Sequence, residues 1–170
     1  MANPLVINAA ELLRRPGNER DVELTVHPDE LDVVDEHVAT DADVDIRLRL
    51  ESLSDGIVVT GSVAVPWAGT CRRCLTPASG TATAEVHELY QLVLTDPDAF
   101  ELVGDQLDLR PMVRELLLLE VPETPVCRED CAGLCPQCGV DRNATDCDCT
   151  TTDADPRWDA LGALRAQLDG

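Results

Sequence analysis

The chain has 170 residues, of which 33 are acidic and 13 are basic, all of them arginine, and its formal net charge is −20. A surface that tracks phosphates needs clustered basic side chains, so this charge argues against unaided binding to nucleic acid. The hydrophobic content of 44% is enough for a core. The length predicts one domain with at most a small appendage.

The sequence also bears on the compartment. The start of the chain has no positively charged stretch ahead of an apolar one, as a secretory signal would have. The longest run of leucine, Leu116–Leu119, is far shorter than the roughly 20 residues of a membrane-spanning helix. We therefore expect a cytoplasmic protein without membrane association. In such a reducing compartment, clustered cysteines bind metal more often than they form disulfides.

The N-terminal region carries short structural signals. Asn8 followed by Glu11 has the form of a capping box and Pro16-Gly17 ends it, which predicts a helix of about two turns. Apolar and polar residues then alternate from Val22 to Val26, which predicts a strand. The acidic segment 29–42 fits either a loop or a frayed helix.

Three longer segments have a clear period of two and are predicted as strands: 43–51, 57–67 and 81–90. The turn Ser54-Asp55-Gly56 between the first two is typical of a tight hairpin. Gly61 interrupts the second strand and is expected at a bulge or a bend. With the earlier strand at 22–26, these segments predict an antiparallel meander that is either open or barrel-like.

One amphipathic helix follows the strands. Apolar residues recur at helical spacing from Leu109 to Leu117, Asp108 is placed to cap the helix, and Pro122 ends it. A second helix is predicted from Asp155, and its apolar face either docks on the core or meets a partner. The predicted fold class is α+β, with a meander covered by helices. Its parts are the sheet and covering helix in 1–122, a cysteine-rich segment in 123–150 and a C-terminal docking helix in 151–170.

Six of the eight cysteines lie in residues 127–149, where almost no apolar residue could build a core. Four thiolates on a zinc ion contribute roughly 10–16 kcal/mol, which is enough to order such a segment. Cys135-Pro136-Gln137-Cys138-Gly139 has the form of a zinc knuckle, whose glycine lets backbone N–H groups bond to the sulfurs. We predict a structural zinc site of Cys135 and Cys138 with two of the remaining four: Cys127, Cys131, Cys147 and Cys149.

The other pair, Cys71-x2-Cys74, lies in the loop between the second and third predicted strands and is the candidate for a second site. A thioredoxin-like redox pair needs a helix N-terminus, which this loop does not offer. An iron–sulfur cluster is an alternative that a colourless preparation would exclude. The three histidines are scattered and no nucleophile or phosphate-binding motif is present, so we predict no enzymatic activity.

Several motifs follow one another in a set order along the chain. Val65-Pro66-Trp67 precedes Cys71-x2-Cys74, and Gly104-Asp105 precedes the aliphatic helix. Cys131-x-Gly-Leu-Cys135-Pro-x-Cys138-Gly and Asp155-Pro156-Arg157-Trp158 come after it. This order resembles the YceD family, whose members are called large ribosomal RNA subunit accumulation proteins. The resemblance covers nearly the whole chain and looks like the actinobacterial and Gram-positive type.

The resemblance implies a non-enzymatic role in the accumulation or processing of large-subunit (23S) ribosomal RNA. Because the chain is acidic, we expect its contact in large-subunit assembly intermediates to be a basic ribosomal protein. Direct RNA contact would come through local arginines such as Arg72 and Arg73. The alternative is a metal- or redox-responsive regulatory protein that uses spare thiols as its sensor.

Overall fold

The computed structural model describes residues 3–38 and 41–149, together with Leu161. The predicted C-terminal docking helix, 151–170, therefore lies outside the described residues apart from Leu161. The chain divides into two compact units, Met1–Cys71 with Thr76–Cys127 and Arg72–Leu75 with Arg128–Gly170. The first unit contains the sheet and its covering helix, and the second contains most of the cysteine-rich segment.

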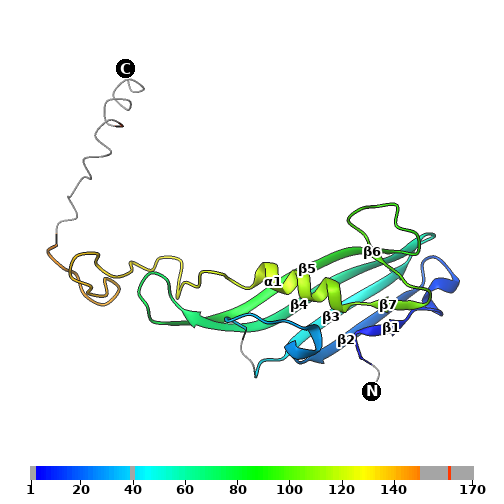
Figure 1. Cartoon of the computed structure of the whole chain (residues 1–170), viewed down its shortest axis with the longest axis horizontal. Helices are drawn as coiled ribbons and strands as arrows, with labels where there is room; N and C mark the ends of the chain where they lie inside the picture. Colours follow the sequence, from blue (N-terminus) through cyan, green and yellow to red (C-terminus); the bar gives the residue numbers. More distant parts are fainter. Residues whose placement is uncertain (1–2, 39–40, 150–160, 162–170) are drawn as a thin grey trace. The chain divides into compact units, whose positions relative to one another are not determined.

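The first unit is built on a five-stranded sheet in the order β2-β3-β4-β5-β6 (Figure 1). The strands are β2 (Glu19–Val26), β3 (Val44–Ser52), β4 (Gly56–Thr70), β5 (Pro77–Gln91) and β6 (Phe100–Glu101). β2 to β5 form the predicted antiparallel meander, and β6 runs parallel to β5. β2 and β6 are its two edges, so the sheet is open and does not close on itself.

The alternating pattern places one face of the sheet in the core. In β3, every second residue from Val44 to Leu50 is buried, and the charged residues between them are exposed. β4 keeps the pattern through Gly61, which pairs in register with Leu48 and Val86, so no extra residue is inserted there. Gly61 has a φ of +138°, and a Cβ at this position would collide with the carbonyl oxygen of Arg47. Only glycine fits this position.

The helix α1 (Arg110–Glu120) covers the buried face, where it packs against β4 and β5 (Figure 1). Met112, Val113 and Leu117 are fully buried among the aliphatic side chains of the strands. The Asp108 carboxylate accepts the N–H of Arg110 at 3.0 Å and pairs with its guanidinium at 2.6 Å, and these bonds lower the pKa of Asp108. In the described part of the chain, no helix is both long and apolar enough to cross a membrane.

The helix predicted after Asn8 is wrong, because the region forms a strand and a single 3-10 turn. β1 (Val6–Asn8) pairs with β7 (Gln106–Asp108), and η1 (Leu12–Arg14) follows. The N–H of Ala9 donates to the carbonyl of Asp105 at 2.8 Å, so sheet pairing engages the residues that would have begun the helix. In the acidic segment, the described part contains the 3-10 turn η2 (Pro28–Leu31) rather than a longer helix.

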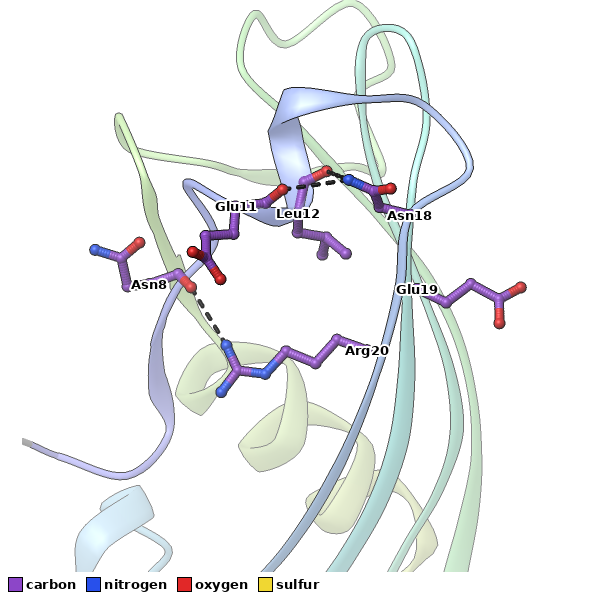
Figure 2. Close-up of a pocket in the computed structure, with 6 residues that line it drawn as sticks. All are labelled: Asn8, Glu11, Leu12, Asn18, Glu19 and Arg20. Carbon is purple, nitrogen blue, oxygen red and sulfur yellow. Dashed lines mark hydrogen bonds between the residues drawn. The ribbon is translucent and has the colours of Figure 1, made fainter.

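A polar cavity of about 700 Å³ lies beside η1 and β2 (Figure 2). The Arg20 side chain donates to the carbonyl oxygen of Asn8 at 3.4 Å, and the Asn18 amide donates to the carbonyls of Glu11 and Leu12 at 3.3 Å each. The Arg20 bond joins β2 to the end of β1, and the Asn18 bonds join the residue before β2 to the start of η1. The polar lining of this cavity therefore has a local structural explanation.

Candidate metal centres

The eight cysteines gather into two groups of four. The hairpin tetrad consists of Cys71, Cys74, Cys127 and Cys131, and the segment tetrad consists of Cys135, Cys138, Cys147 and Cys149. Within each group the sulfur atoms lie within 4.8 Å of one another. A tetrahedral zinc ion with bonds of about 2.3 Å places its sulfurs about 3.8 Å apart. Each tetrad could therefore hold a metal ion after a small contraction.

The hairpin tetrad begins at the turn that joins β4 to β5. The N–H of Cys71 donates to the carbonyl of Thr76 at 2.8 Å and closes this turn. Leu75, directly after Cys74, has a φ of +59° and is 64% exposed. Leucine rarely adopts this left-handed conformation, which costs roughly 1–2 kcal/mol. The turn keeps both of its cysteines buried despite this strain.

Arg73 links residues 129–134 to the same turn through hydrogen bonds. Its guanidinium donates to the carbonyls of Glu129 at 2.8 Å and Cys131 at 3.2 Å, and its own carbonyl accepts the N–H of Leu134 at 2.9 Å. Gly133 has a φ of +71°, and a Cβ there would lie 3.0 Å from the Arg73 carbonyl oxygen, so glycine permits this close approach. The side chain expected to meet a partner thus makes intramolecular bonds.

The segment tetrad is centred on a reverse turn. The N–H of Cys135 donates to the carbonyl of Val140 at 2.8 Å, and the N–H of Gly139 donates to the carbonyl of Cys135 at 2.9 Å. Gly139 has a φ of +74° and follows its cysteine pair as Leu75 follows the other. The backbone N–H groups of Cys138 and Gln137 donate to the Cys135 sulfur and lower the pKa of this thiol to about 6. Such N–H···S bonds stabilise a thiolate and are those of a metal-binding knuckle.

Within the segment tetrad, neighbouring thiols oppose the ionisation of one another. The pKa of Cys149 is raised to about 12, chiefly because its thiol hydrogen-bonds to the Cys138 sulfur and also because of burial. Four sulfurs at this separation do not all ionise without a cation, since each thiolate raises the pKa of its neighbours. Arg142 lines a cavity of about 80 Å³ with Cys135 and Cys147.

Asn143, which lies between Cys138 and Cys147 in the sequence, forms a hydrogen bond to a cysteine of the hairpin tetrad. Its amide nitrogen donates to the Cys131 sulfur at 3.4 Å and to the Asp141 carboxylate at 2.6 Å. Its side-chain oxygen accepts the N–H of Ala132 at 2.8 Å and the guanidinium of Arg128 at 2.7 Å. Such a donor orients a thiolate ligand and tunes its charge. Sequence reasoning missed Asn143, although the Asp-x-Asn pattern is typical of side chains that cap turns.

The structure divides the six clustered cysteines in a way that their spacing left open. Cys147 and Cys149 join the Cys135–Cys138 knuckle, whereas Cys127 and Cys131 lie with the pair from the β4–β5 turn. Among the described residues, no histidine or carboxylate belongs to either group. A donor set made only of thiols is typical of closed structural sites, because catalytic zinc keeps an open position.

Comparison with known proteins supplies the family. The model of one protein family, described as "Large ribosomal RNA subunit accumulation protein YceD", matches residues 59–165. The chain belongs to the YceD family. The match includes all eight cysteines as well as β5 and α1, so both tetrads lie in the part that resembles the rest of the YceD family. The family description associates its members with the accumulation of the large ribosomal RNA subunit.

Other proteins resemble this YceD-family chain to different extents. An uncharacterized protein of Mycobacterium tuberculosis is 39% identical over 173 residues, which cover 95% of this chain and 81% of the relative. An uncharacterized protein of Mycobacterium leprae is 32% identical over 82% of this chain and 68% of the relative. The Arabidopsis thaliana protein named "Large ribosomal RNA subunit accumulation protein YCED homolog 1, chloroplastic" is 35% identical over 63 residues, which are 37% of this chain and 20% of that protein. No solved structure matches the chain.

Proposed function

We propose that this chain is a non-enzymatic, zinc-stabilised factor that supports the accumulation and processing of large-subunit (23S) ribosomal RNA in the cytoplasm. The observation that carries the proposal is the family match over residues 59–165, whose description names the accumulation of the large ribosomal RNA subunit. The Arabidopsis relative carries the same process in its name.

Each tetrad would hold one structural zinc ion. Cys71, Cys74, Cys127 and Cys131 would supply one set of thiolates, and Cys135, Cys138, Cys147 and Cys149 would supply the other. Zinc suits four soft thiolates in a tetrahedron, and such a site leaves no coordination position for water or substrate. The ions would therefore stabilise the fold around them and take no part in a reaction.

The proposed partner is a basic ribosomal protein within a large-subunit assembly intermediate. The net charge of −20 repels the phosphates of naked RNA and steers a basic protein toward the chain. Arg72 and Arg73 are exposed at the β4–β5 turn and remain the predicted local contact to the assembly intermediate. Arg73 would contribute by exchanging its bonds to the carbonyls of Glu129 and Cys131.

The competing function is a metal- or redox-responsive regulator. A sensor of this kind needs reactive thiols outside its metal sites, whereas the two tetrads account for all eight cysteines. This observation favours the structural role. Thiol titration of the zinc-loaded chain separates the two functions: a structural protein reacts only after a chelator is added, and a sensor reacts before.

The ribosomal role is tested in a strain that lacks the gene. We expect a lower ratio of large- to small-subunit ribosomal RNA, and we expect the tagged protein to sediment with precursors of the large subunit in a sucrose gradient. A normal ratio, together with protein that stays at the top of the gradient, would contradict the proposal. Zinc content by elemental analysis tests the metal sites separately from the ribosomal role.

A further inference from the structure

A groove of about 430 Å³, lined by both apolar and acidic side chains, lies along α1 at the β5–β6 end of the sheet. Phe100, Met112 and Leu116 line it, and Met112 is fully buried. Phe100 is held in place by stacking on Tyr90, with ring centroids 5.2 Å apart. Leu119 also lines the groove and is 74% exposed. Core residues therefore shape the groove, while an apolar side chain remains open to a partner.

Three carboxylates from different elements line the same groove. Glu88 comes from β5, Asp98 from the β5–β6 loop and Glu115 from α1. None of them forms an ion pair with an arginine in the described part of the chain. Burial, and then the charge of Glu115, raise the pKa of Glu88. A basic group from outside would relieve this repulsion.

The loop that supplies Asp98 also exposes apolar residues. Leu92, Val93 and Leu94 follow one another after β5 and are 49%, 74% and 53% exposed. Apolar side chains exposed singly are ordinary, but a consecutive exposed run marks an interaction surface. The loop that lines the groove through Asp98 thus carries further exposed apolar residues, which suits a protein segment better than a small molecule.

We propose that this groove binds an amphipathic segment of a partner protein, with its apolar residues in the groove and its arginine or lysine residues paired with Glu88, Asp98 and Glu115. Charge complementarity selects this occupant, because a second copy of the chain would bring a further net charge of −20. Segments with apolar residues at helical spacing dock in such grooves. The inference rests on the proposed function in one respect: it names the surface through which a basic ribosomal protein would bind.

The test uses the full, zinc-loaded chain and a fluorescein-labelled synthetic peptide of about 18 residues, made of leucine at i, i+3, i+4 and i+7 spacing with arginine elsewhere. A scrambled peptide of the same composition is the charge-matched control. By fluorescence anisotropy, we expect the amphipathic peptide to bind about tenfold more tightly than the scrambled one. Leu119→Ser and Glu115→Gln should each weaken binding by about three- to tenfold. Both positions are exposed, so neither change removes core packing.

Glu120→Gln is the matched control, because Glu120 lies on the same helix but does not line the groove, and it should leave the affinity within about twofold. Equal binding of both peptides, or no effect of Leu119→Ser, would overturn the inference, since the net charge alone would then explain binding. A photo-crosslinker at position 119 that joins the chain to itself or to a second copy without peptide would also overturn it. These binding results do not depend on ribosomal RNA levels, so the groove and the proposed function can fail separately.

Discussion

The turns at Cys71–Cys74 and Cys135–Cys138 have the same spacing but different supports. The first ends a hairpin of two strands that are each 15 residues long, whereas no helix or strand is assigned in the described residues around the second. The residue after each pair has a positive φ, +59° at Leu75 and +74° at Gly139. Where strand pairing sets the backbone, an unfavourable residue is tolerated. Where no strand pairing sets the backbone, the residue with the lowest conformational cost is present.

The sheet and the cysteine-rich residues also differ in which side chains they bury. The sheet and α1 share a continuous aliphatic core. In residues 128–149 the buried positions are Cys131, Gly133 and Cys135, which cannot form one. Hydrophobic burial thus stabilises the first unit. Hydrogen bonds hold the cysteine-rich residues, and the proposed metal ions would add to their stability. Four predictions test this difference, from the largest expected effect to the smallest.

Cys138→Ser should have the largest effect, because it removes a thiolate from a group whose metal contributes roughly 10–16 kcal/mol. We expect elemental analysis to show about one zinc ion per chain rather than about two. Limited proteolysis should cut residues 135–149 while circular dichroism of the strands is retained. Lowering the pH should also release metal, since protons compete for the thiolates. Ala144→Ser is the control, and an unchanged zinc content in Cys138→Ser would contradict the assignment of the segment tetrad.

Leu50→Ala should act on the other unit alone. Leu50 is fully buried in the sheet core, and truncating such a residue costs about 2–5 kcal/mol because a cavity remains. Urea denaturation followed by the strand signal should show this loss, and the zinc content should stay the same. Val34→Ala, at a position that is 94% exposed, is the control with no expected change. If Leu50→Ala released zinc under native conditions, the two modes of stabilisation would not be separate.

Asn143→Leu should weaken metal binding at the hairpin tetrad while the ligands stay in place. It removes the donor to the Cys131 sulfur, and loss of such outer contacts lowers metal affinity by about 10- to 100-fold. Competition with a chromophoric chelator measures this change. Asn18→Leu is the matched control, because Asn18 lies in the other unit and bonds to η1. Equal zinc affinity in the Asn143 variant and the natural chain would show that this bond has no such role.

The two residues after the cysteine pairs should respond in opposite directions. Leu75→Gly relieves strain of roughly 1–2 kcal/mol and loses about 0.5–1 kcal/mol to chain entropy, so a small stabilisation is expected. Gly139→Ala places a Cβ at a φ of +74° and should destabilise its turn by about 1 kcal/mol. Midpoints of thermal zinc release from the two variants measure both effects. If both substitutions shifted the midpoint in the same direction, the proposed difference between the two turns would be contradicted.

Patterns of period two and of helical spacing were sufficient to predict the meander and the α1 helix, because each pattern matches one regular structure with one buried face. The N-terminal helix was wrong for a physical reason: the pairing of β1 with β7 engages the backbone of residues 6–8 and overrides the local signal of Asn8 and Glu11. Pairing between segments about 100 residues apart cannot be predicted from a short window of sequence.

For the candidate metal centres, too, the sequence predicted one part and the tertiary structure determined the rest. The residue types and the two Cys-x-x-Cys spacings were enough to expect metal-binding thiols, since closely spaced cysteines without an aliphatic core need another source of order. The partners of Cys127 and Cys131 were decided by tertiary structure, which brings them to the β4–β5 turn rather than to the knuckle that follows them in the chain. Tertiary structure also determined the contacts of Arg73 and Asn143. Spacing limits which thiols can meet, but only the folded path of the backbone determines which ones do.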